Sequence, residues 1–94
     1  MNKYECHITC AREHAAQVES LGKTMRWSFS QIDGDPLMGQ QPYCYLTHYH
    51  TDGLELKISM ALVSRALRAG GVPVLREKIE RIVYDTKTGV NEIR

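Results

Sequence analysis

The stretch YECHITC, residues 4–10, gives the clearest indication of the fold, because its apolar and polar residues alternate. On one side of an extended chain lie Tyr4, Cys6, Ile8 and Cys10, and on the other lie Glu5, His7 and Thr9. A period of two is typical of a β-strand with one buried and one exposed face. We therefore predict a first strand here, with its cysteines and isoleucine in the core.

The residues that follow this strand change to a helical period. An apolar stripe at helical spacing, which predicts a helix over residues 11–26, is formed by Ala11, Ala15, Val18, Leu21 and Met25. Gly22 lies inside this segment, where glycine costs about 1 kcal/mol relative to alanine, so it marks a candidate end of the helix. A short second strand is predicted over residues 27–32, and the sequence DGDP at residues 33–36 then breaks the chain.

The second half repeats the order of strand, helix and strand. Residues 43–49 are rich in aromatic and β-branched side chains, which favour a strand. Asp52 and Glu55 have the spacing of a capping box, and Gly70 and Gly71 end the helix predicted over residues 54–69. Residues 72–80 fit a strand. The segment from residue 75 also fits a helix, but Gly-Gly-Val-Pro-Val is a poor helix start, so we favour the strand.

This order predicts an α+β fold, the ferredoxin-like βαββαβ sandwich. It has a four-stranded antiparallel sheet with two helices on one face, the first and third strands being central and the fourth lying beside the first. The 94 residues suit one domain, residues 1–94, in which 85–94 are expected to form a turn and a loose end.

Composition restricts the classes of function. The formal charge is +1, with 12 basic and 11 acidic residues, and this argues against nucleic-acid binding because such domains usually carry a basic excess. No apolar run approaches the ~20 residues that cross a membrane, and the N-terminus does not resemble a signal peptide. Three cysteines are a poor disulfide framework and suit a reducing compartment. We therefore expect a cytoplasmic protein with no membrane segment.

The open face of the predicted sheet carries the main candidate site. Glu5, His7 and Thr9 point away from the helices, and the neighbouring strand offers Arg76, Lys78 and Glu80 at matching positions. Arginine and lysine can hold a phosphate or carboxylate, and histidine transfers protons near neutral pH. We expect these six residues to bind an anionic small molecule or a protein partner, with His7 as the best candidate for catalysis. The alternative is a structural role, in which these residues form a solvent-exposed sheet face that is stabilised by pairs of side chains on neighbouring strands.

The sequence His7-Ile8-Thr9 resembles one half of the site of the two-histidine phosphoesterases, whose sites carry two His-x-Thr/Ser motifs. The resemblance implies a small phosphoester-acting enzyme with His7 as acid or base. This chain departs from the pattern, because neither His48 nor His50 stands two residues before a serine or threonine. The motif therefore supplies an alternative function and no family assignment.

Metal, cofactor and RNA sites are less well supported. Cys6 and Cys10 lie four residues apart on a strand, so their side chains are separated by about 13 Å and cannot bind one ion together. No metal site is predicted from Cys44, His48 and His50 either. Nucleotide-binding loops and dinucleotide fingerprints are missing, so no cofactor is expected. Aromatic residues at 43, 45 and 49 could stack on bases as in RRM domains, but the RNP consensus is missing.

The second predicted helix has two apolar faces. Leu56, Met60, Val63 and Leu67 can cover the sheet, whereas Leu54, Ile58 and Leu62 lie on another face that needs cover of its own. Symmetric homo-oligomers are common, so we expect self-association through these three residues. An accessory or assembly protein without any ligand is the third class of function.

Overall fold

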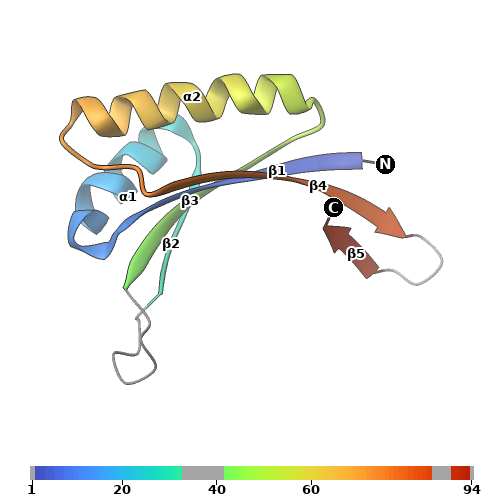
Figure 1. The fold of residues 1–94 in the computed structure, drawn as a ribbon, viewed down its shortest axis with the longest axis horizontal. Helices are drawn as coiled ribbons and strands as arrows, with labels where there is room; N and C mark the ends of the chain where they lie inside the picture. The colour runs from blue at the N-terminus through green and yellow to red at the C-terminus, as the bar shows by residue number, and fades with distance from the viewer. Residues whose placement is uncertain (1, 33–41, 86–89, 94) are drawn as a thin grey trace.

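The computed structural model describes residues 2–32, 42–85 and 90–93. Its elements follow in the order β1 (Asn2–Ala11), the 3-10 turn η1 (Arg12–His14), α1 (Ala15–Met25), β2 (Ser28–Ile32), β3 (Tyr43–His50), α2 (Gly53–Ala69), β4 (Arg76–Asp85) and β5 (Val90–Ile93). The strands form one antiparallel sheet in the order β2-β3-β1-β4-β5, and α1 and α2 pack on one of its faces (Figure 1). The chain is thus an α+β protein, and the order β2-β3-β1-β4 is consistent with a ferredoxin-like arrangement.

The core lies between the sheet and the two helices. Cys6, Ile8 and Cys10 of β1 are completely buried, and so are Cys44 and Leu46 of β3. The helices cover them with a set of buried side chains made of Val18, Leu56, Met60, Val63 and Leu67. The alternation predicted for residues 4–10 is therefore confirmed, and the opposite face of the sheet carries neither helix.

Helix α1 continues past Gly22 to Met25, so the glycine does not end it. A Cβ atom at position 22 would lie only 2.6 Å from Cδ2 of the buried Leu46, so the glycine lets the helix approach β3 closely. The helix ends instead at Arg26, whose φ of 63° is left-handed, and the Trp27 amide donates to the Gly22 carbonyl at 2.8 Å. The loop residues 33–36 lie outside the described residues.

The ends of α2 follow the predicted signals. Asp52 caps the first turn, where its Oδ1 accepts from the amides of Leu54 at 2.9 Å and Glu55 at 3.2 Å. At the other end Gly71 has a φ of 83°, and the Val72 amide donates to the Leu67 carbonyl. This cap uses the amide that a strand at residue 72 would need, and Pro73 has none, so β4 begins at Arg76 and not at Val72.

The C-terminal segment differs from the prediction. Residues 85–94 were expected to be a turn and a loose end, but β5 pairs with the end of β4, from Ile82 opposite Ile93 to Asp85 opposite Val90. Four residues are too few to show a strand period in the sequence, and the hydrogen-bonding edge of β4 supplies the missing stabilisation. Residues 86–89, which join the strands, lie outside the described residues. No helix in the described part of the chain is long and apolar enough to cross a membrane.

Candidate functional site

The open face of β1 presents Glu5, His7 and Thr9, because the alternate residues are buried under the helices. β4 runs antiparallel beside it, with Thr9 opposite Arg76, His7 opposite Lys78 and Glu5 opposite Glu80. The structure thus brings all six predicted site residues together in three cross-strand rows on one face.

Two ion pairs run along the strands of this face. The Glu5 carboxylate contacts Nε2 of His7 on β1, and Nζ of Lys78 lies 2.5 Å from Oε1 of Glu80 on β4. The Glu5 and Glu80 side chains are only 14% and 12% exposed, so both carboxylates are largely shielded from water. Each acid therefore has a basic group two residues away on its own strand, which offsets the repulsion between the two carboxylates across the strands.

Arg76 differs from the other charged residues of this face. Its side chain is exposed at the start of β4, and it forms no ion pair with any acid among residues 3–32 and 42–82, whose side chains the structure describes. It lies in one cross-strand row with Thr9 and Tyr45. This row therefore offers a guanidinium and two hydroxyl groups to a ligand.

Sequence reasoning missed the contribution of β3. Thr47 lies directly opposite His7, and its Oγ1 is 2.9 Å from Nδ1 of the imidazole. Tyr45 stands opposite Thr9, and Ser30 of β2 stands opposite Tyr45. The period of two that places Tyr45 and Thr47 on this face is present in the sequence, but the opposite face combines its apolar residues with two histidines, so polarity does not separate the two faces.

A hollow of about 340 Å³ opens on this face. Its lining includes the side chains of His7, Thr9, Tyr45, Thr47, Arg76 and Lys78. The Glu80 carboxylate, which pairs with Lys78, also lines it. The hollow thus combines two cations, one carboxylate, hydroxyl groups, an aromatic ring and one imidazole, and such polar groups bind and orient ligands in protein pockets.

The cysteines and the other histidines of the sheet lie on the opposite face. Burial raises the pKa of the Cys6 and Cys10 thiols to about 11, so they are poor metal ligands as well as poor nucleophiles. The His48 ring stacks on Trp27 with centroids 5.0 Å apart, and His50 accepts the Asp52 amide proton at Nδ1. Within the residues that the structure describes, no three His, Cys, Asp or Glu side chains gather as metal ligands.

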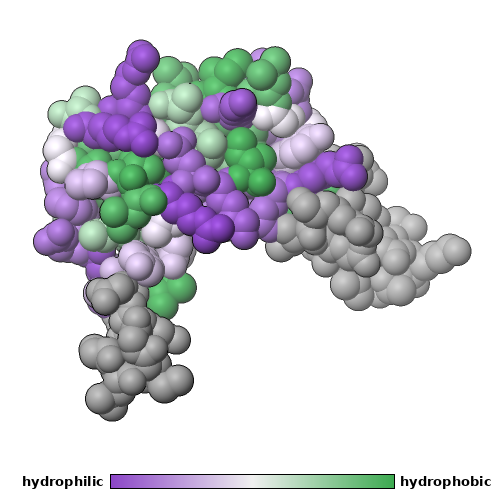
Figure 2. Space-filling view, viewed as in Figure 1, coloured by the Kyte–Doolittle hydropathy of each residue, from purple (hydrophilic) through white to green (hydrophobic). Residues whose placement is uncertain are grey.

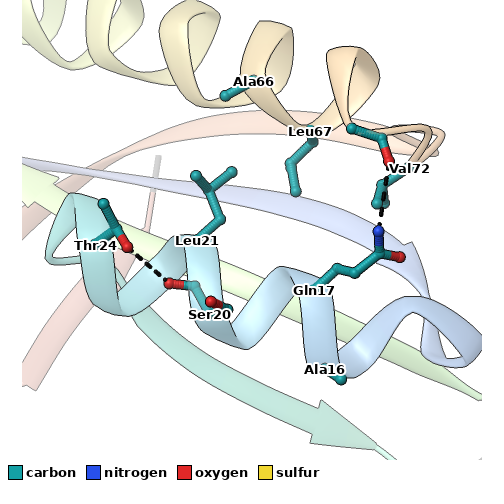
Figure 3. A pocket seen from close by; sticks show the side chains of 9 residues that line it. Ala16, Gln17, Ser20, Leu21, Thr24, Ala66, Leu67 and Val72 are labelled. Atoms are coloured by element: carbon teal, nitrogen blue, oxygen red, sulfur yellow. Dashed lines mark hydrogen bonds between the residues drawn. The ribbon is translucent and has the colours of Figure 1, made fainter.

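A larger hollow of about 480 Å³ lies between α1 and α2 (Figure 3). Small and apolar side chains such as Ala16, Leu21 and Ala66 line much of it, and Gln17 Nε2 donates to the Gly70 carbonyl at 3.4 Å on its rim. Its lining contains no charged side chain. The open face of the sheet is therefore the better candidate site for chemistry.

Comparison with models of known protein families and with curated proteins finds no match to this chain. Its function must accordingly be inferred from the geometry above.

Proposed function

We propose that the chain is a ferredoxin-like binding module whose open sheet face holds a small anionic molecule. The observation that carries this proposal is Arg76, which lines the 340 Å³ hollow with an exposed guanidinium and has no acidic partner among residues 3–32 and 42–82. A guanidinium binds a carboxylate or phosphate through two parallel hydrogen bonds. A neutral ligand would leave this charge uncompensated.

The neighbouring groups suit the same ligand. Lys78 follows Arg76 on the same face, about 6.6 Å along the strand, so both side chains can reach one anionic group. The hydroxyl groups of Thr9 and Tyr45 can donate to its remaining oxygens, and the Tyr45 ring offers an apolar surface to the rest of the molecule. Lys78 already pairs with Glu80, so Arg76 is expected to contribute more of the affinity.

An NMR titration with inorganic phosphate, adenosine monophosphate and citrate tests the proposal. Shifts should concentrate at Thr9, Tyr45 and Arg76. Arg76→Gln should weaken binding about tenfold or more, since a hydrogen bond to a charged group contributes roughly 1.5–3 kcal/mol. Arg81→Gln is the matched control, because Arg81 is exposed on the same strand but has the opposite parity, and it should bind as the wild type does.

Equal weakening by both arginine variants would mean a diffuse charge effect and would contradict the site. If none of the three anions shifts the resonances of this face, a small anionic ligand is contradicted. A protein partner, the other ligand expected for this face, would then be favoured.

A phosphoester-acting enzyme with His7 as acid or base is the alternative from another class. It is supported by the contact of His7 with both a carboxylate and a hydroxyl group. Loss of phosphodiester hydrolysis in His7→Ala, at unchanged thermal stability, would favour this alternative over a binding module.

Self-association through α2 is a second proposal, carried by the exposure of its outer apolar side chains. Leu54, Ile58 and Leu62 are 67%, 48% and 53% exposed, and apolar atoms gather along α2 in the space-filling view (Figure 2). An antiparallel pairing about a two-fold axis near residue 60 would place Ile58 against Leu62 of the partner subunit. The same axis brings Glu55 near Arg65 of the partner subunit, so the charges of the face are self-complementary.

Sedimentation analysis over a range of concentrations tests this interface. Leu62→Glu should abolish the dimer, whereas Ala16→Glu on the exposed part of α1 should not change it. A dimer that survives Leu62→Glu would contradict the α2 interface. The free thiols of Cys6, Cys10 and Cys44 support a reducing, cytoplasmic location for the protein.

A further inference from the structure

We infer that Thr47 is a nucleophile activated by His7 and Glu5, and that this face can cleave a carboxylic ester. The geometry that points to this activity is a series of three side chains in contact, Glu5, His7 and Thr47. The Glu5 carboxylate contacts Nε2 of the imidazole, and Oγ1 of Thr47 lies 2.9 Å from its Nδ1. A hydroxyl, an imidazole and a carboxylate in this order are the parts of an acyl-transfer site.

The contacts fix the tautomer of the imidazole. An ionised carboxylate only accepts hydrogen bonds, so the proton of a neutral His7 lies on Nε2, next to Glu5. Nδ1 then carries a lone pair, and the Thr47 hydroxyl donates to it. The imidazole is thereby ready to take the hydroxyl proton, and Glu5 is ready to stabilise the imidazolium that forms.

The three side chains are also held in place. Glu5 and His7 lie two residues apart on β1, and Thr47 lies directly opposite His7 on β3, so all three stand on two adjacent interior strands of the sheet. The Glu5 and His7 side chains are 14% and 31% exposed, which limits their movement. A site on regular strands is positioned more precisely than a site on a loop.

The proposed step is acyl transfer to threonine. The Thr47 oxygen attacks the carbonyl carbon of the ester, and its proton passes to Nδ1 of His7. The tetrahedral intermediate then breaks the bond to the alcohol, which leaves with the proton from His7, and an acyl-threonine remains. Water, deprotonated by the same nitrogen, then attacks the acyl carbon. The bond to Oγ1 of Thr47 breaks, His7 returns the proton to Oγ1, and the carboxylic acid leaves.

Hydroxyl groups around Thr47 can donate to the oxyanion of the intermediate. Ser28 is its cross-strand neighbour on β2, and Tyr45 stands two residues before it on the same face. Both belong to the open side of the sheet, so an ester can approach from solvent. These donors are expected to stabilise the intermediate less than a pair of fixed backbone amides, so we expect a slow esterase.

The placement of the single histidine favours an ester of a carboxylic acid over a phosphoester for this nucleophile. In acyl transfer the leaving alcohol departs on the side of the attacking hydroxyl, so one imidazole can serve both. In phosphoryl transfer the leaving oxygen is in line with and opposite to the nucleophile, and needs a second proton donor. On the described open face His7 is the only histidine, because His48 and His50 have the opposite parity.

Reaction with p-nitrophenyl acetate, followed by peptide mass spectrometry, tests the inference. The wild-type protein should release a burst of p-nitrophenolate and carry an acetyl group on Thr47. Thr47→Ser should keep the burst, and Thr47→Val should lose it. Thr51→Val is the matched control, since Thr51 is exposed beyond the end of β3, and it should react as the wild type does.

His7→Gln should lower the rate of Thr47 acetylation about 100-fold, the usual contribution of a general base. Glu5→Gln keeps the size of the side chain, but its amide can donate to Nε2 and so move the imidazole proton to Nδ1, where it blocks transfer from Thr47. We expect at least a tenfold slower burst in this variant at unchanged thermal stability. A structural role alone would leave the burst unchanged, and that result would overturn the role of Glu5.

Acetyl groups found on lysines alone, or a Thr47→Val variant that keeps the wild-type burst, would overturn the inference. The ester carries no charge, whereas the titration described above uses anions. The acetylation experiment therefore tests the nucleophile, the anion titration tests the binding site, and either can fail without the other.

Discussion

Gly22 offers a quantitative test of how α1 packs on the sheet. A methyl group at this position would lie 2.6 Å from Cδ2 of Leu46 and 3.4 Å from the carbonyl oxygen of Trp27. Leu46 is completely buried, so it cannot rotate away without disturbing its neighbours. Overpacking of this kind costs about 1–3 kcal/mol, and the better helix propensity of alanine returns about 1 kcal/mol. We therefore expect Gly22→Ala to lower the free energy of unfolding by about 1 kcal/mol.

Urea denaturation followed by the fluorescence of Trp27 measures this change. With a slope of about 1 kcal/mol per molar urea for a chain of this size, the midpoint should fall by about 1 M. Gly70→Ala is the matched control, because Gly70 has a φ of −85° and an added Cβ meets only carbonyl oxygens, at 3.5 Å and 3.6 Å. That variant should keep or gain stability.

The side chain of Leu46 gives an independent check. Leu46→Val shortens the side chain and removes the terminal atom that the new methyl group meets, so Gly22→Ala should become less destabilising in this background. If Gly22→Ala raises stability in the wild-type background, the close approach of α1 to β3 described above is refuted.

Three further predictions concern the cap, the histidine stack and the thiols. Asp52→Ala removes the acceptor of two helix amides and should cost about 1 kcal/mol of unfolding free energy, measured by urea denaturation. Burial and the neighbouring His50 lower the pKa of His48 below its usual 6.5, so the unfolded chain binds the proton more readily than the folded chain does. The contribution of His48 to the free energy of unfolding should therefore be fully present above pH 6.5 and fall as the pH drops below it. In His48→Gln this part of the pH dependence should be missing. Cys6 and Cys10, whose pKa values are raised to about 11, should react with a thiol reagent such as Ellman's only after denaturation, and fast labelling of the folded protein would contradict their burial.

The sequence was most informative where the two faces of an element differ sharply in polarity. On β1 every second residue is apolar and the others are polar, so its buried face could be predicted without a structure. On α2 both faces are apolar, so the helical period and not polarity separated them, and Leu56 is buried and Leu54 exposed as expected. On β4 the charges of Arg76 and Lys78 identified the exposed face.

The features that were missed depend on tertiary contacts. The role of Gly22 follows from its distance to Leu46, a residue 24 positions away in the sequence, and no local pattern contains that distance. Strand β5 is stabilised by the edge of β4 and not by its own four residues. Thr47 was missed because its strand places tyrosines on one face and cysteine, leucine and histidine on the other, so polarity does not separate them.

The same alternation that builds the core also fixes the candidate site. A shift of one residue in the pairing of β1 would turn Cys6 and Ile8 to solvent and force Glu5 and His7 under the helices, where unpaired polar groups are costly. The register is therefore fixed by burial of the apolar side chains of the strand and does not depend on which polar residues stand on its open face. As a result Glu5, His7 and their neighbours can be replaced without loss of the register that places them, and the variants proposed above are expected to fold. Changes in binding or acylation in these variants can accordingly be attributed to the missing groups.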